Sequence, residues 1–313
     1  MAISLFGRSF LTLLDYSTEE IEYLLKLSAK CKAEAKKGKK FKRFEGKTLA
    51  LLFEKRSTRT RCAFETAFGE EGGHPVFLSS ADIHLGVKEA LEDTARVLGR
   101  MFSAIQFRGF KQETAEILAK YSGVPVYNGL TDIDHPTQAL ADLLTLQENF
   151  GALKGRTLCY VGDGRNNVAR ALMIICAKLG TNFTVITPPQ LNADGELLHK
   201  CSLLAKTSGA VIKVTPDLGA VKGADALYTD VWTSMGEEDQ KAERVKLLSP
   251  YQVNQKLMDM TGNSGAIFLH CLPAVKGEEV TVDVIDGPQS KAWDQAENRK
   301  HTIKAVMLAT LIK

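Results

Sequence analysis

Short apolar runs alternate with helical stretches along the first half of the chain. These runs are at residues 48–53, 76–78, 104–107 and 124–128. The segments between them have helical spacing, including one with Cys62, Ala63, Phe64 and Ala67 on its apolar side. Alternation of strand and helix is typical of a parallel sheet with helices on its faces.

A second series of apolar runs begins after the glycines at 151 and 155. Its members are 157–163, 182–187, 210–215, 226–232 and 266–272, again with helical segments between them. The pattern predicts an α/β protein with two doubly wound parallel-sheet lobes and an active site in the cleft between them.

The two ends of the chain are predicted to be helical. Ser17 and Glu20 form a capping-box pattern before an amphipathic stretch, which indicates a helix start. The last segment, from about 290 to 313, has helical spacing, and we expect it to pack back on the first lobe. We therefore predict a first domain of 1–150 plus this C-terminal helix, and a second domain of 151–289.

Composition excludes several classes of protein. The chain has 313 residues, 44% of them hydrophobic and 25% charged, as ordered globular proteins have. A formal net charge of +3 is too small to indicate general binding to nucleic acid or anionic membranes. No apolar run is long enough to span a bilayer, and the six cysteines show no metal-binding spacing. We expect a cytoplasmic protein with free thiols.

One cluster of cations stands out, in the stretch FEKRSTRTR at 53–61. It directly follows the first predicted strand, and ligands of open α/β sheets bind where strands end and helices begin. Ser57 is a candidate N-cap, so Ser57, Thr58, Arg59 and Thr60 could surround a phosphate with N–H, hydroxyl and guanidinium donors. Alternatively, Ser57 only caps the helix and the arginines form surface ion pairs.

Other polar groups follow other predicted strands. They are Arg108, His135 to Gln138, Asp230 and the stretch 270–273. Each also has an ordinary interpretation: Arg108 as a surface ion pair, Gln138 as a helix-face amide, His135 as a core histidine and Cys271 as a buried thiol.

Taken together, these segments resemble the ornithine carbamoyltransferase family. The matching segments are FEKRSTRTR, FRG at 107–109, HPTQALAD at 135–142, GDGRNN at 162–167, DVWTSMGEE at 230–238, FLHCLP at 268–273 and DQAENRKHTIKAVM near the end. They occur in the family's order over nearly the whole chain.

The resemblance implies an enzyme that moves a carbamoyl group from carbamoyl phosphate to the side-chain amine of ornithine, giving citrulline and phosphate in arginine metabolism. It implies that Ser57 to Thr60 bind the phosphate, while Arg108, His135 and Gln138 reach the carbamoyl group. The full set that it implies for carbamoyl phosphate is Ser57, Thr58, Arg59, Thr60, His84, Arg108, His135, Pro136, Thr137, Gln138, Cys271, Leu272 and Arg299.

The resemblance implies that ornithine is bound by Asn167, Asp230, Ser234 and Met235, and that Asp230 and Cys271 bind its side-chain amine. It assigns catalysis to Arg108, His135, Asp230 and Cys271, without a metal or other cofactor. His84 lies where relatives lend a side chain to a neighbouring subunit, which implies an oligomer built on trimers.

Two other classes of function fit parts of the sequence. Gly162 and Gly164 begin a dinucleotide-binding pattern, but the third glycine and the acidic residue after the next strand are missing. The basic stretches could bind nucleic acid, which the near-neutral net charge argues against. Sister enzymes acting on aspartate, putrescine or N-acetylornithine are closer alternatives. The motifs leave the anabolic or catabolic direction open.

Overall fold

The computed structural model describes residues 3–79, 83, 88–233 and 238–313. Within these ranges the chain forms two compact units, one of Met1–Leu144 with Glu297–Lys313 and one of Thr145–Ala296. The chain passes from one unit to the other within α5 (Pro136–Phe150) and α11 (Ala292–Leu311).

The first unit contains a four-stranded parallel sheet in the order β2-β1-β3-β4. The strands are β1 (Thr48–Phe53), β2 (His74–Ser79), β3 (Ala104–Arg108) and β4 (Val126–Leu130). Its helices are α1 (Thr18–Lys36), α2 (Thr58–Gly69), α3 (Leu91–Met101) and α4 (Gln112–Ser122), with the unit's parts of α5 and α11.

Helices cover both faces of this sheet. On one face, α3 and α4 pack through Ala95, Leu98, Ala115 and Leu118 against alternate strand residues such as Phe107. On the other face, Phe64 of α2 and Thr310 of α11 both contact Tyr127 of β4, the latter by a hydrogen bond of 2.8 Å. The first sheet is therefore doubly wound, and the C-terminal helix packs on this unit as predicted.

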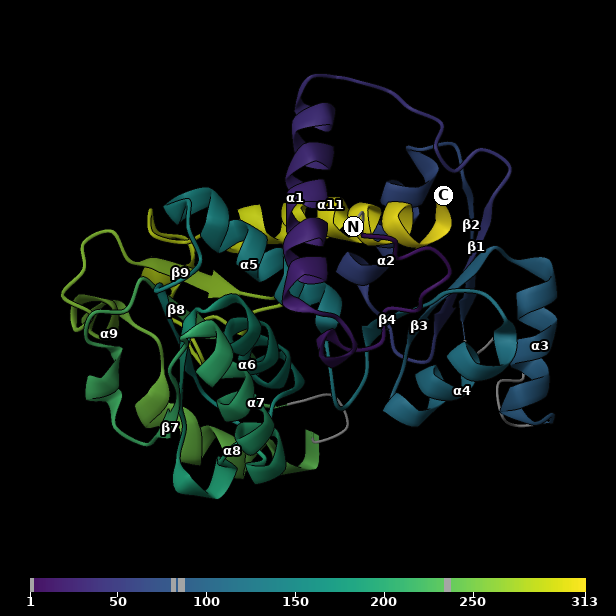
Figure 1. The fold of residues 1–313 in the computed structure, drawn as a ribbon. Helices are drawn as coiled ribbons and strands as arrows, with labels where there is room; N and C mark the ends of the chain where they lie inside the picture. Colours follow the sequence, from purple (N-terminus) through teal and green to yellow (C-terminus); the bar gives the residue numbers. More distant parts are fainter. Residues whose placement is uncertain (1–2, 80–82, 84–87, 234–237) are drawn as a thin grey trace. The chain divides into compact units, whose positions relative to one another are not determined.

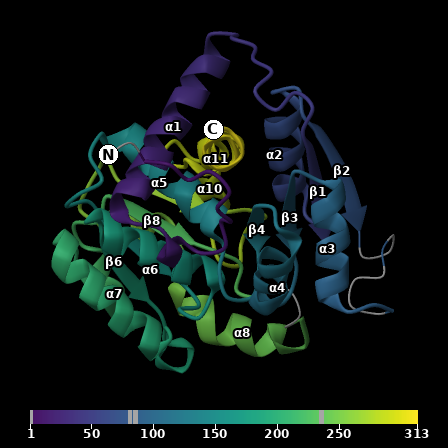
Figure 2. The ribbon, with the colours of Figure 1, turned by 45° about the vertical axis from the view of Figure 1, so that its right-hand side comes forward.

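Two long helices of the first unit lie side by side, α1 and α11 (Figure 2). The ammonium of Lys32 on α1 donates to the Asn298 side chain on α11 at 2.7 Å, and both side chains are buried. The predicted capping box is present: Ser17 Oγ accepts from Glu20 N–H, and the Glu20 carboxylate accepts from Ser17 N–H.

The second unit contains a five-stranded parallel sheet in the order β7-β6-β5-β8-β9. Its strands are β5 (Thr157–Val161), β6 (Asn182–Ile186), β7 (Ile212–Thr215), β8 (Ala226–Thr229) and β9 (Ile267–His270). Its helices are α6 (Asn167–Leu179), α7 (Gly195–Ser208), α8 (Lys241–Leu248), α9 (Gln255–Asp259) and α10 (Val282–Ile285). Residues of α9 and α10 pack with Cys159, Leu227 and Phe268 into one core, and α6 and α7 lie side by side (Figure 1).

Strand order reverses once in each sheet, and this reversal locates the candidate site. The chain adds β2 on one side of β1 and then β3 on the other, and it likewise adds β6 and then β8 on opposite sides of β5. At this point the loops after two neighbouring strands lead to opposite faces of the sheet. The gap between these loops is where ligands bind in open α/β sheets. Predicted site segments lie at the carboxyl ends of β1 and β3 in the first unit and of β5 and β8 in the second, and the segments at 135–138 and 270–273 come after β4 and at the end of β9.

The predicted strands are confirmed, with small shifts at their ends. The run 226–232 gives only four strand residues, Ala226–Thr229, and directly after them the Asp230 carboxylate accepts a hydrogen bond from Val231 N–H. Likewise β5 ends at Val161. The next residue, Gly162, has a φ of 144°, a backbone conformation that residues with a Cβ rarely adopt. Polar groups of the candidate site follow directly after these early strand ends.

Candidate active site

In the first unit, Ser57 caps α2 directly after β1. Its Oγ accepts a hydrogen bond of 3.3 Å from Thr60 N–H. Thr58 and Arg59 are the first two residues of the helix, with Thr58 exposed and Arg59 half-buried. The predicted helix start is therefore present, and a helix N-terminus attracts anions through its free N–H groups and its dipole.

Thr60 is the centre of a buried hydrogen-bond network. Its Oγ1 accepts from Arg108 Nη1 at 3.0 Å and from Arg299 Nη2 at 3.3 Å. Thr60 is 1% exposed, Arg299 2% and Arg108 8%. Because two guanidinium groups donate to the oxygen, the hydroxyl proton of Thr60 is left to donate to another acceptor.

Arg299 also holds the start of α5. Its Nη1 donates to Gln138 Oε1 at 2.7 Å, and its Nη2 lies 3.5 Å from Thr137 Oγ1. Pro136 is the first residue of α5, a position that suits proline because no N–H is needed there. The structure thus brings together residues that are up to 239 positions apart in the sequence.

His135 is neutral in this environment. Burial lowers its pKa well below the ordinary value, and the charges of Arg299, Arg108 and Arg59 lower it further. Its Nδ1 lies 3.4 Å from Thr137 Oγ1. A neutral imidazole can donate one N–H to a ligand without adding to the positive charge of the three arginines.

Sequence analysis missed the residue that orients Gln138. Gln138 Nε2 donates to Asp142 Oδ1 at 2.7 Å, and Asp142 is fully buried. A carboxylate accepts only from the NH₂ end of the amide, so Asp142 directs Oε1 toward Arg299. The spacing of four residues on a helix was the signal that could have identified it.

In the second unit, Asp230 is the residue directly after β8, and Cys271 is the residue directly after β9. Cys271 Sγ donates to Asp230 Oδ1 at 3.0 Å, and Val231 N–H donates to the same oxygen at 2.8 Å. Asp230 is 7% exposed, and Cys271 is half-buried. The carboxylate is therefore held in place by its own loop and by the next strand.

Asn166 joins this group across the point where the strand order reverses. It caps α6 with its Oδ1 on Val168 N–H at 2.7 Å, and its Nδ2 donates to Asp230 Oδ2 at 3.0 Å. The predicted residue, Asn167, is the first residue of α6 and lies next to it in the chain. We did not single out Asn166 from the sequence, although an asparagine before a helix is a common cap.

A buried histidine and glutamate support the loop that carries Cys271. His270 Nδ1 accepts from Leu272 N–H at 2.8 Å, so its proton lies on Nε2, 3.2 Å from Glu279 Oε1. The same Glu279 oxygen accepts from Val275 N–H at 2.6 Å. Both side chains are fully buried. Leu272 has a φ of 60°, and its peptide bond to Pro273 is cis.

Asp230, His270 and Cys271 also place three possible metal-ligand atoms within 4.8 Å of one another. However, both ring nitrogens of His270 are already engaged, one by Leu272 N–H and the other by Glu279. A metal ion would have to displace one of these bonds.

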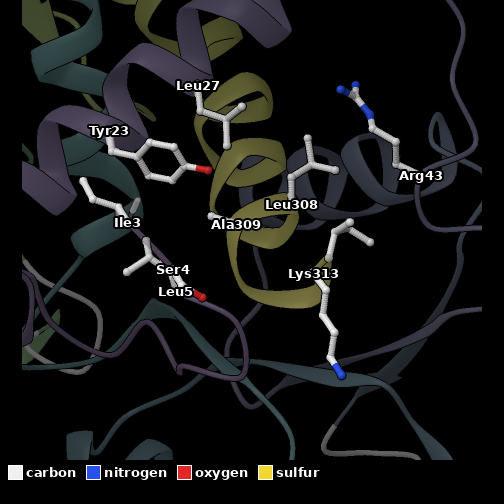
Figure 3. Close-up of a pocket in the computed structure, with 10 residues that line it drawn as sticks. Ile3, Ser4, Leu5, Tyr23, Leu27, Arg43, Leu308, Ala309 and Lys313 are labelled. Carbon is white, nitrogen blue, oxygen red and sulfur yellow. The ribbon is translucent and has the colours of Figure 1, made fainter. Parts of the chain in front are cut away.

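Three predicted residues, His84, Ser234 and Met235, lie outside the described residues. A shallow groove elsewhere in the first unit, of about 300 Å³, contains none of the predicted site residues (Figure 3). Its walls are mainly apolar side chains such as Tyr23, Leu27 and Leu308, and the guanidinium of Arg43 at its edge bonds Glu71 and Glu34.

Comparison with known proteins identifies the family. The profile of the aspartate/ornithine carbamoyltransferase carbamoyl-P binding domain matches residues 8–148, and that of the Asp/Orn binding domain matches residues 154–310. The chain belongs to the aspartate/ornithine carbamoyltransferase family. It is therefore a carbamoyltransferase.

Relatives within this family are similar over the whole chain. Proteins named ornithine carbamoyltransferase from Pseudothermotoga lettingae and Thermotoga maritima are 64% and 62% identical, each over 100% of both chains. The solved ornithine carbamoyltransferase from Pyrococcus furiosus is 47% identical, with a TM-score of 0.96 over 99% of each chain. Full-length matches of this kind argue against the dinucleotide-binding and nucleic-acid-binding alternatives.

Within the described residues, no helix is long and apolar enough to cross a membrane.

Proposed function

We propose that this carbamoyltransferase transfers the carbamoyl group of carbamoyl phosphate to the side-chain amine of L-ornithine, giving L-citrulline and phosphate. The observation that carries the choice of acceptor is the Cys271–Asp230 hydrogen bond of 3.0 Å. It places a fixed carboxylate and a thiol at the carboxyl ends of two strands, where a cationic amine would bind. The names of the full-length relatives support the same acceptor.

Carbamoyl phosphate is the proposed ligand of the first unit. Ser57, Thr58, Arg59 and the N–H groups of α2 bind its phosphate, while Thr60, Arg108 and His135 donate to the carbamoyl oxygen. Negative charge develops on that oxygen during attack and on the phosphate as it leaves, so donors fixed in advance lower the barrier. Pro136, Thr137, Gln138 and Arg299 complete this half-site, with Cys271 and Leu272 from the second unit and His84 from a neighbouring subunit.

Ornithine is the proposed ligand of the second unit. Asp230 and Cys271 bind the side-chain amine, and Asn167, Ser234 and Met235 bind the amino-acid end. The amine must lose a proton before it attacks, because a free alkylamine is mostly protonated near neutral pH. Positioning and electrostatic stabilisation are sufficient for this direct transfer. The cleft expected between the two lobes stays a prediction.

The cellular setting of this reaction belongs to the same proposal. We place the enzyme in the cytoplasm, in arginine metabolism, as an assembly built on trimers. Relatives include a protein from Bacillus licheniformis that is 53% identical and is named as a catabolic ornithine carbamoyltransferase. Measuring citrulline synthesis and citrulline phosphorolysis side by side would determine the favoured direction, and light scattering would determine the assembly.

An acceptor panel tests the proposed reaction. The purified protein is incubated with carbamoyl phosphate and ornithine, putrescine, N-acetylornithine or aspartate, and both ureido product and phosphate are measured. Citrulline from ornithine is the expected product, with little or none from the other amines. Preference for another amine would retain the carbamoyl-phosphate site and overturn the reading of the second unit.

A further inference from the structure

The hydroxyl group of Tyr160 is buried without a partner. Tyr160 lies near the end of β5 and is 0% exposed, and its Oη has no hydrogen-bond partner among the described residues. Leaving a buried polar group unpaired destabilises the folded protein. Phenylalanine would fill the same space without this cost, so the hydroxyl requires an explanation.

The neighbouring tyrosine shows the usual arrangement. The rings of Tyr160 and Tyr228 are stacked, with centroids 5.9 Å apart and planes at 27°. Tyr228 is equally buried, but its hydroxyl accepts a hydrogen bond of 3.0 Å from Gln295 Nε2. Two adjacent phenols in the same core therefore differ only in whether the hydroxyl is satisfied.

The Tyr160 hydroxyl lies next to the turn that begins the second half-site. A Cβ at Gly162 would come within 3.9 Å of this hydroxyl and within 3.5 Å of Thr229 Oγ1. Gly162 therefore leaves space at the carboxyl ends of β5 and β8. This is the pair of strands between which the strand order reverses.

The charged groups around the hydroxyl are those of the same half-site. Besides burial, Asp230, Asp163, Cys271 and Glu279 all raise the pKa of Tyr160. Several of these groups already have partners: Asp163 pairs with Arg165 and Arg244, and Glu279 pairs with His270. The phenol thus remains protonated and neutral beside Asp230 and Cys271.

We propose that Tyr160 Oη is a further contact for the side-chain amine of the acceptor, in the half-site formed by Asp230 and Cys271. This inference rests on the proposed transfer to ornithine. The amine brings two or three N–H donors into this region, and one carboxylate cannot accept all of them in a fixed direction. A neutral phenol oxygen accepts one N–H without adding negative charge. It therefore orients the nitrogen without further favouring the protonated, unreactive form.

Tyr160→Phe is the direct test, because it removes only the oxygen atom. The ligand-free variant should keep or raise its Tm, since the lost hydroxyl has no partner in the protein. The KM for ornithine should rise about tenfold, equivalent to about 1.4 kcal/mol of binding. The KM for carbamoyl phosphate should stay within twofold. Tyr228→Phe is the matched control: it should lower Tm, because Gln295 loses its acceptor, and leave the KM for ornithine unchanged.

Spectroscopy provides a second readout that does not depend on the stability of Tyr160→Phe. Ornithine added to the wild-type protein together with inorganic phosphate, so that no transfer occurs, should change the near-ultraviolet tyrosine spectrum, and Tyr228→Phe should retain that change. An unaltered KM for ornithine in Tyr160→Phe, or a wild-type spectrum insensitive to ornithine, would overturn the contact while citrulline formation still supported the proposed function. Absence of citrulline from the wild-type protein would instead overturn the function itself.

Discussion

Cys271 Sγ donates to Asp230 Oδ1 over 3.0 Å, and this bond joins the ends of β8 and β9 in the second unit. The same carboxylate accepts from Val231 N–H and Asn166 Nδ2. Three donors on one carboxylate fix its direction and leave its charge to attract a cation.

Asp230→Asn should reduce kcat/KM for ornithine by about 10³-fold or more, since it removes the charge that binds the amine. Affinity for carbamoyl phosphate should change less than threefold, as measured by isothermal calorimetry. Asp239→Asn is a matched control, because this exposed carboxylate lies outside the proposed site. Normal turnover in Asp230→Asn would remove Asp230 from the proposed mechanism.

Thr60→Val tests the centre of the first half-site. The change keeps the shape of the side chain but leaves Arg108 Nη1 and Arg299 Nη2 without their shared acceptor. We expect kcat/KM for carbamoyl phosphate to fall by about 10²- to 10³-fold, the range found when one donor to a developing oxyanion is lost. Thr66→Val on the same helix is the control, since its exposed hydroxyl donates to the Cys62 carbonyl at 2.6 Å and is no part of the proposed site. Equal effects of the two changes would contradict a specific role for Thr60.

Asp142→Asn tests whether a buried carboxylate orients Gln138. An asparagine at 142 can donate its NH₂ to the Gln138 carbonyl oxygen. Gln138 can then turn its own amide, so that Nε2 instead of Oε1 faces the Arg299 guanidinium. The KM for carbamoyl phosphate should rise at least tenfold, while the far-ultraviolet circular dichroism stays unchanged. An Asp142→Asn variant with a wild-type KM would show that Gln138 needs no such support.

Much of this architecture was readable in the sequence because parallel strands buried on both faces give continuous apolar runs. The helix starts were readable from Ser17 and Ser57, whose side chains cap their helices as predicted. Family resemblance, rather than local pattern, singled out Arg299, which lies 2% exposed in a helix with mixed charged and apolar residues. Nothing near Arg299 in the chain indicates that Thr60, 239 positions earlier, is its partner.

The supporting residues were missed for a different physical reason. Asp142, Asn166 and Tyr160 act through geometry that the sequence does not contain, such as the direction of an amide or a hydroxyl without a partner. Their residue types are common at helix caps and in cores, so composition does not distinguish them. Tyr160 lies near the carboxyl end of β5 and Asn166 shortly after it, and this location suggests a role.

Glu279→Ala tests the support of the Cys271 loop by its effect on stability. Glu279 Oε1 accepts from both His270 Nε2, which is buried, and the partly buried Val275 N–H, so truncation leaves both donors without this acceptor. Urea unfolding should show a loss of about 2–5 kcal/mol. Glu279→Gln should lose much less, because its carbonyl oxygen can accept the same two bonds. Glu278→Ala, which removes a partly exposed pair with Lys241 at 2.8 Å, should cost less than about 1 kcal/mol. Similar losses at 278 and 279 would refute the support role.

His135 makes a prediction about pH. In the folded protein its pKa is well below the ordinary value, owing to burial and then to Arg299, Arg108 and Arg59, whereas in the unfolded chain it is about 6.5. At a pH between these two pKa values, His135 carries a proton in the unfolded chain but not in the folded protein. Stability is therefore fully present above about pH 6.5 and declines as the pH falls, by up to about 1.4 kcal/mol per pH unit for one proton.

His135→Gln should remove this contribution to the pH dependence of stability. Chemical unfolding between about pH 5 and 6.5 should show a shallower pH dependence in the variant, by up to one proton. His301→Gln serves as a comparison, because burial also lowers the pKa of His301 although Glu297 partly opposes the effect. Its change in slope should be smaller than that of His135→Gln. Parallel stability curves for the wild type and His135→Gln would mean that His135 is protonated in the folded enzyme, and the neutral donor proposed for the carbamoyl oxygen would have to be replaced by an imidazolium.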